Sequence, residues 1–133
     1  MKKRILSLAL SAAMALTMLP TGAFAASDKG KPPVYNKATG CYEISTPDQL
    51  LYLSGSWRDG APRDGHYVLT ADIDMTGVKG FKPIASKKDQ GFTGTFDGQF
   101  HAIKGLRVEY EKKYAGLFGY VGNQDDQAYI KDV

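Results

Sequence analysis

The stretch FTGTFDGQFHAIKGLRVEY at residues 92–110, followed by YAGLFGYVG at residues 114–122, decides the fold of this chain. Apolar and polar residues alternate along it, and Gly or Asp-Gly interrupts the alternation every few residues. This pattern is typical of short strands separated by sharp corners. Such strands bury their apolar faces only by stacking on the next turn of chain. We therefore predict an all-β protein, a right-handed parallel β-helix.

A short helix is predicted ahead of these strands. Residues 46–49, TPDQ, match a capping box in which Thr46 is the N-cap and Gln49 reaches back to it. An apolar stripe at helical spacing then continues as far as Trp57, and Gly55 is placed to end the helix. We expect about two helical turns, which would cap the N-terminal end of the β-helix.

Residues 1–25 have the layout of a secretory signal peptide. Three basic residues come first, an apolar run follows from Ile5 to Leu19, and a small-residue pattern ends at Ala25. The run is shorter than the roughly 20 apolar residues that a membrane helix needs, so we predict export and cleavage, with no membrane span afterwards. Residues 26–41 are rich in Lys, Pro and Gly and are predicted to be a flexible linker, which leaves residues 42–133 for the fold.

The charge of the chain resides in the signal segment. Removing residues 1–25 takes away three of the 17 basic residues and leaves 14 of them against 14 Asp and Glu. A neutral mature chain without a basic cluster in its sequence argues against nucleic acid as a partner. Cys41 is the only cysteine, so no internal disulfide can form, and we expect it to be structural.

Several of these segments resemble the GLUG-type β-helix repeats of secreted and surface bacterial proteins. The resemblance rests on residues 92–108, on YAGLFGYVG and on the final AYIKDV, and it extends upstream to ISTPDQLLYLS and YVLTADIDM. That group includes adhesin-like proteins and the N-terminal segments of IgA-specific metallopeptidases. It implies a location in the bacterial envelope or outside the cell. These coils are scaffolds for proteins of different activities, so the resemblance implies architecture more than function.

The resemblance assigns structural roles to two short motifs. Their residues are Phe96, Asp97 and Gly98 at one corner and Gly116, Leu117, Phe118 and Gly119 in the repeat that names the group. Glycine would allow close approach or a positive φ, and Phe and Leu would line the stacked interior. No catalytic residue of the family falls on this chain, and no H-E-x-x-H motif is present.

The chain ends at Val133, where the resemblance predicts that another strand is starting. A solenoid that ended there would expose an unpaired coil. We therefore expect either that the sequence is the front of a longer protein, or that a partner or a second copy covers this end.

The first functional hypothesis is a secreted or cell-surface binding scaffold, adhesin-like, that contacts a carbohydrate or a protein. Its candidate ligand surface includes Trp57 and Arg58 in a surface loop and the carboxylates Asp72 and Asp74 on one strand. Three tyrosines suit stacking on sugars: Tyr110, Tyr114 and Tyr120. The alternative for all of these residues is ordinary packing or solvated turns.

A polysaccharide-processing enzyme is the second hypothesis. Its acid/base groups would be Asp72 with Asp74, or Asp97 with His101. A third is a non-catalytic N-terminal module of a larger exported enzyme or peptidase. No cofactor is expected, and the spacing after Asp72 does not fit an EF-hand because the twelfth loop position is Pro83.

Overall fold

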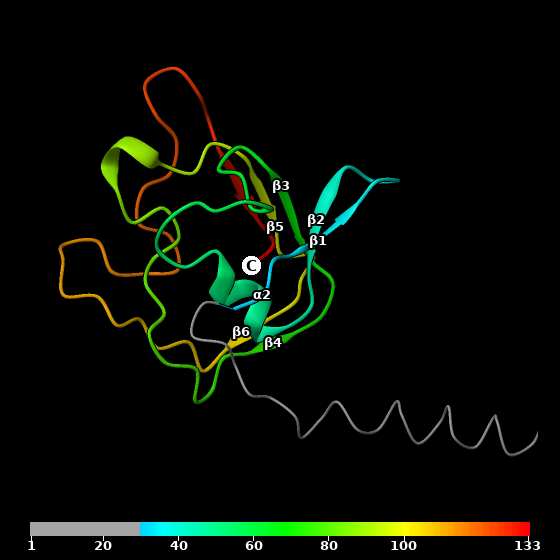
Figure 1. The fold of residues 1–133 in the computed structure, drawn as a ribbon, viewed down its shortest axis with the longest axis horizontal. Helices are drawn as coiled ribbons and strands as arrows, with labels where there is room; N and C mark the ends of the chain where they lie inside the picture. Colours follow the sequence, from blue (N-terminus) through cyan, green and yellow to red (C-terminus); the bar gives the residue numbers. More distant parts are fainter. Residues whose placement is uncertain (1–29) are drawn as a thin grey trace, which may run out of the picture.

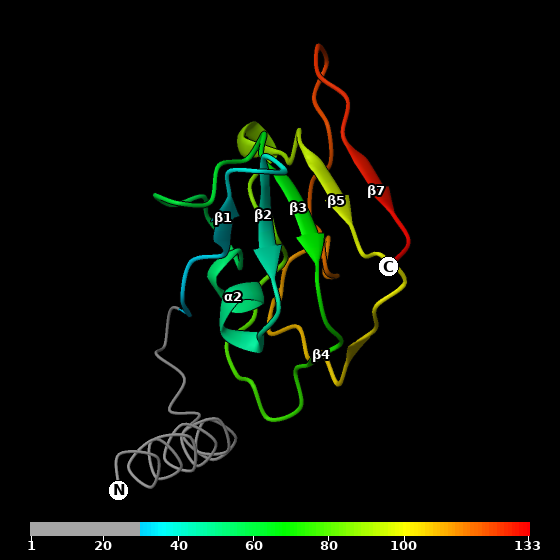
Figure 2. The ribbon, with the colours of Figure 1, turned by 90° about the vertical axis from the view of Figure 1, so that its right-hand side faces the viewer.

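The computed structural model describes residues 30–133, so the predicted signal peptide lies outside the described residues. Within that range the protein is all-β with one short α-helix, as predicted. One sheet holds five strands in the order β1 (Val34–Asn36), β2 (Cys41–Ile44), β3 (His66–Leu69), β5 (Thr95–Asp97) and β7 (Tyr129–Lys131), which Figure 2 shows side by side. A second sheet pairs β4 (Ile73–Asp74) with β6 (Ile103–Lys104).

Regular structure begins before Tyr42, inside the segment that the sequence assigned to the linker. β1 pairs antiparallel with β2, and the Gly40 N–H donates to the carbonyl of Asn36 (2.8 Å) to close the turn between them. The Asn36 amide also donates to Glu43 (2.7 Å), and the rings of Tyr35 and Tyr42 lie 4.9 Å apart. The linker composition did not indicate this hairpin because its stability comes from cross-strand contacts.

Helix α2 (Pro47–Tyr52) starts at the predicted capping box. The Thr46 side chain accepts from the Gln49 N–H (3.3 Å), and the Gln49 side chain accepts from the Thr46 N–H (3.2 Å). The helix is shorter than predicted, because Leu53 is its C-cap and Trp57 lies beyond it. In Figure 1 α2 lies over the middle of the ring of chain, and in Figure 2 it lies at the β1/β2 end of the sheet, away from β7. Its position suits a cap on that end.

The strands after α2 pair in parallel as the chain returns to the same place. Tyr67 of β3 lies opposite Phe96 of β5, which in turn lies opposite Ile130 of β7. Ile73 and Ile103 are partners in the second sheet. Two further parallel bridges join Ile84 to Phe118 and Phe92 to Val121. We refer to residues 66–94 as the first circuit and residues 95–128 as the second. The five-stranded sheet is mixed, since β1 alone is antiparallel.

The core lies inside these circuits. Apolar and polar residues alternate from Tyr67 to Thr76, but the structure divides this stretch into β3 and β4, with a corner at residues 70–72 between them. The inward-facing residues remain buried across that corner, among them Leu69 and Ile73. Tyr67 is also buried, and its hydroxyl donates to the carbonyl of Pro62 (2.7 Å). Burial raises the pKa of Tyr67, so the phenol stays neutral.

Candidate ligand-binding site

An open cavity of about 810 Å³ lies on one side of the circuits. Its walls come from three separate parts of the chain: the end of α2 and the loop after it, residues 80–88, and residues 110–120. The charged and aromatic side chains that line it are Arg58, Lys82, Lys87, Lys88, Lys112, Lys113, Tyr110, Tyr114 and Tyr120. We call this site the basic tyrosine cavity. Its volume lies in the range of roughly 300 to 1,000 Å³ that is usual for ligand sites.

The cavity lies where the two circuits differ in length. Asp74 pairs with Lys104, and the next parallel bridge joins Ile84 to Phe118. Between these two pairs the first circuit advances 10 positions (74 to 84), whereas the second advances 14 (104 to 118). From that bridge to the next, which joins Phe92 to Val121, the first circuit is the longer one. It advances eight positions (84 to 92), and the second circuit advances three (118 to 121). The additional residues of the longer circuit have no partners in the ladders of paired strands, so they form loops. These loops carry Lys87, Lys88, Lys112, Lys113 and Tyr114.

The tyrosines of the cavity are held in place by contacts with one another and with the wall. The Tyr110 hydroxyl donates to the Ser86 carbonyl (3.2 Å). The rings of Tyr114 and Tyr120 meet edge to face, with centroids 5.2 Å apart. The Lys113 ammonium lies 5.7 Å from the centroid of the Tyr114 ring, which is within the range of a cation–π contact. The aromatic wall is therefore built into the site.

Charge is strongly segregated at this cavity. Residues 30–133 contain 13 Lys and Arg and 13 Asp and Glu, yet six of the basic residues and none of the acidic ones line it. None of its five lysines takes part in an ion pair among the described residues. The carboxylate of Glu109 is close by, where it accepts from the N–H of Gly80 (3.1 Å). Basic residues that are dispersed in the sequence thus form a cluster in the structure, so the lack of a basic cluster in the sequence does not by itself exclude a polyanionic ligand.

Trp57 and Arg58, which the sequence singled out together, have different environments. The Trp57 indole N–H donates to the carbonyl of Gln90 (2.7 Å), and its ring stacks on Phe92 with centroids 5.9 Å apart. Trp57 therefore packs against the core. Arg58 lines the cavity, with its guanidinium 5.3 Å from the centroid of the Tyr52 ring. Only Arg58 of this pair is placed for a ligand.

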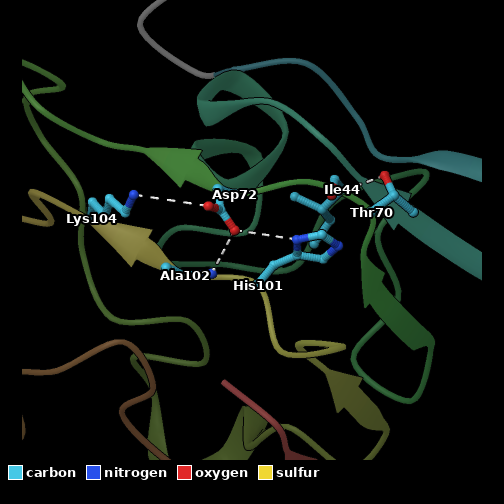
Figure 3. A network of polar contacts seen from close by, with 6 residues as sticks. All are labelled: Ile44, Thr70, Asp72, His101, Ala102 and Lys104. Atoms are coloured by element: carbon cyan, nitrogen blue, oxygen red, sulfur yellow. Dashed lines mark hydrogen bonds and ion pairs between the residues drawn. The ribbon is translucent and has the colours of Figure 1, made fainter.

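The carboxylates Asp72 and Asp74 make separate local contacts, not a shared site. Asp72 accepts from the Ala102 N–H (3.0 Å), contacts His101 Nδ1 (3.2 Å) and lies 3.8 Å from the Lys104 ammonium, as Figure 3 shows. The Ala102 N–H and then His101 hold the pKa of Asp72 below its ordinary value. Asp74 accepts from the Thr76 N–H (2.9 Å), and hydrogen bonds from Thr76 lower its pKa as well. Asp72 links the two circuits, and Asp74 closes the turn after β4.

Asp97 and His101 do not form the pair that the enzyme hypothesis requires. Asp97 accepts from the Gln99 N–H (2.9 Å) and forms an ion pair with Lys131 (3.1 Å), while His101 contacts Asp72 instead. The Gln99 N–H, followed by Lys131, lowers the pKa of Asp97. Gln99 and Phe100, which lie between the two residues, have positive φ values of 48° and 61°, so the chain turns sharply between Asp97 and His101.

The glycines and aromatic residues of the two predicted motifs lie where neighbouring circuits touch. Phe96 is fully buried, and its ring meets Phe118 edge to face at 5.3 Å. A Cβ on Gly98 would overlap the carbonyl of Asp132, and one on Gly119 would lie 2.9 Å from the carbonyl of Ala85. Close approach explains both glycines, since neither has a positive φ.

Of the remaining two motif residues, Leu117 takes part in pairing between the circuits, and a Cβ at Gly116 would meet no close contact. Leu117 is half-buried, and its carbonyl accepts from the Ile84 N–H (2.8 Å) across the circuits. At Gly116 the nearest atom to an added Cβ would be the Phe118 carbonyl at 3.5 Å, an ordinary contact. Gly116 therefore has room for a side chain.

The described residues were also compared with the requirements of a metal site and of a membrane-spanning helix. Across residues 30–133, no group of three or more His, Cys, Asp or Glu side chains is placed to hold a metal ion. In the same range, no helix has the length and apolar character to cross a membrane. Cys41 is a half-buried free thiol in β2, outside the cavity lining.

Comparison with known proteins adds one relative. Halomucin of Haloquadratum walsbyi (strain DSM 16790 / HBSQ001) is 40% identical over 100 residues. The match covers 63% of this chain but 1% of halomucin, so the chain corresponds to a very small part of that protein. No family model matches the chain, and no solved structure matches it.

Proposed function

We propose that this protein is a secreted or cell-surface binding module that contacts an extracellular carbohydrate or protein through the basic tyrosine cavity. The cavity is the observation that carries the binding role. It is open, has the volume of a ligand site and presents ammonium, guanidinium and phenol groups. An adhesin-like role and membership of the GLUG-type repeats belong to the same proposal.

The proposed architecture is a right-handed parallel β-helix with α2 as its N-terminal cap. Its support is the parallel register of β2, β3, β5 and β7, together with the parallel pairing of β4 with β6. Repeated return of the chain to the same ladders is what stacked coils require.

A cross-linking experiment tests the parallel stacking on a Cys41→Ser background. Val68 lies opposite Asp97 in the parallel register, whereas an antiparallel arrangement centred on Tyr67 and Phe96 would place Val68 opposite Thr95. Cysteines at positions 68 and 97 should therefore form a disulfide on mild oxidation, and cysteines at 68 and 95 should not. Preferential bridging of the second pair would overturn the architecture.

Export is supported by the sequence of residues 1–25 and is compatible with the match to halomucin. The enzyme hypothesis has less support. The cavity lining contains no Asp, Glu or His, and the lowered pKa values of Asp72 and Asp97 do not suit a general acid. A non-catalytic module of a larger exported enzyme or peptidase would use the same cavity.

Cell fractionation and an array of glycans and extracellular proteins test the binding role. The protein expressed in a bacterium should be found in the medium or the envelope fraction, and a matched variant without residues 1–25 should remain in the cytoplasm. The purified protein should bind at least one array ligand, and that ligand should protect residues 110–120 from hydrogen exchange. Cytoplasmic retention of the intact chain, or no ligand on the array, would contradict the proposal.

A further inference from the structure

We propose that the ligand of the basic tyrosine cavity is an acidic polysaccharide, one that carries carboxylate or sulfate groups on its sugar rings. This inference rests on the proposed binding function and names its ligand class. It follows from the charge, the hydrogen-bonding groups and the shape of the cavity.

The charge of the cavity indicates an anion. Five lysines and Arg58 converge on one concavity of a chain whose described residues carry equal numbers of basic and acidic groups. Exposed lysines are common, but they are normally interspersed with carboxylates. Like charges gathered in a concave site repel one another and focus a positive potential on the space between them. An anionic ligand relieves this repulsion.

The loop lysines come as two adjacent pairs from separate segments of the cavity wall, Lys87 with Lys88 and Lys112 with Lys113. Charges distributed around an open cavity suit a ligand with several separated negative groups better than a single small anion. Lys88 lies in the short 3₁₀ helix η2 (Lys88–Gln90), and Lys112 and Lys113 lie on the longer loop of the second circuit.

The uncharged part of the lining suits a sugar. Among the described residues, the hydroxyls of Ser56, Tyr114 and Tyr120 have no hydrogen-bond partner, so they can donate to or accept from ligand hydroxyls. The exposed ring of Tyr114 also offers an apolar face beside the ammonium of Lys113. A pyranose ring presents C–H groups and hydroxyls to such a wall, and its acidic substituents would meet the lysines.

Polysaccharide is favoured over nucleic acid by the predicted export of the chain, because export removes the protein from the nucleic acid of the cytoplasm. The binding test uses the purified protein and four probes: alginate, dextran sulfate, neutral dextran and a single-stranded DNA oligonucleotide. Isothermal titration at low salt should show binding of alginate or dextran sulfate, with neutral dextran at least tenfold weaker. Raising the salt should weaken the binding.

Variants locate the site. Lys87→Glu combined with Lys112→Glu should weaken binding of the acidic polysaccharide about tenfold or more, because two charge-assisted contacts become repulsive. The matched control, Lys31→Glu combined with Lys37→Glu, makes the same change in net charge outside the cavity lining and should bind like the wild type. Tyr114→Ala, which leaves the charge unchanged, should also weaken binding. Unchanged melting temperatures would verify that each variant folds.

Four outcomes would overturn the inference. Equal losses in the two charge variants would indicate non-specific attraction and not a site. DNA bound more tightly than both polysaccharides, with the same dependence on Lys87 and Lys112, would assign the cavity to nucleic acid. Binding of a neutral glycan or a protein that neither charge variant changes would contradict this inference, but it would agree with the proposed binding function. Absence of any glycan or protein ligand would overturn both.

Discussion

Two regions of the molecule, the matched ladders and the basic tyrosine cavity, are built from the same two circuits with opposite results. Within each ladder of paired strands the circuits pair residue for residue, so Tyr67 lies opposite Phe96 and Ile73 lies opposite Ile103. At the cavity the circuits differ by several residues, and the surplus chain leaves the ladders as loops. The paired strands form a buried apolar core, whereas the loops outside the pairing line an exposed polar cavity.

The residues that stabilise the fold are therefore different from the residues placed to bind a ligand. Buried aromatic rings in the ladders have no solvent contact, whereas the cavity lysines are exposed and have no ion pairs among the described residues. Burial stabilises the fold, and exposed lysines contribute little to it. A change in the ladders should therefore destabilise the protein, and a change in the cavity should affect ligands.

The largest expected effect is the loss of a ring from the ladders. Phe96 is 0% exposed, and Phe96→Ala should lower the free energy of unfolding by about 3 to 5 kcal/mol through lost burial and a cavity. Chemical denaturation followed by circular dichroism measures this. The control is Phe100→Ala, since Phe100 is 87% exposed and should change stability little. Similar losses in both variants would show that the ladders are not the core.

A smaller effect is expected where a glycine lets neighbouring circuits approach. A Cβ on Gly94 would overlap the carbonyl of Gly65, so Gly94→Ala should cost about 1 to 3 kcal/mol as the backbone shifts. Gly116→Ala is the matched control, because its Cβ would meet nothing closer than 3.5 Å. Thermal unfolding should separate the two variants. If Gly116→Ala destabilised the protein as much as Gly94→Ala, close approach would not explain these glycines.

The smallest expected effect comes from an ion pair at the surface of the ladders. Because the pKa of Asp97 is below its ordinary value of 3.8, its stabilisation is present above that pH and is lost as the pH falls through the folded-state pKa. Asp97→Asn should thus lessen the fall in melting temperature between about pH 5 and pH 2. Its control is Asp59→Asn, at an exposed aspartate outside the strands, which should leave the acid dependence as in the wild type. An unchanged slope in Asp97→Asn would contradict the assignment.

Much of the fold could be predicted from local sequence, because local interactions determine those parts. The capping box at Thr46 and Gln49 depends on side chains three residues apart, and it forms as predicted. Apolar and polar residues alternate from residue 67 to 76, and the apolar residues Leu69 and Ile73 of that series are buried. The end of α2 at Tyr52 and the hairpin of β1 were not predicted, since packing and cross-strand pairing decide them.

The candidate site was predictable only in part. The three tyrosines suggested for sugar stacking do meet in one cavity, although the sequence offers no reason for their meeting. The six basic residues were missed as a group. A signal was present in the two Lys-Lys pairs at residues 87–88 and 112–113, but 25 residues separate Lys87 from Lys112 in a neutral chain.

Neighbours along the chain are enough to predict the short strands, the helix cap and the alternation of apolar residues, because each of these depends on residues a few positions apart. The glycines Gly98 and Gly119 are needed because another circuit lies against them. Tertiary structure alone decided which strands became partners, that Asp72 contacts His101 while Asp97 contacts Lys131, and that dispersed lysines surround one cavity. The physical reason is that the lengths of successive circuits, compared with each other, fix where chain must leave the ladders. Such a comparison can be made only after the pairing is known.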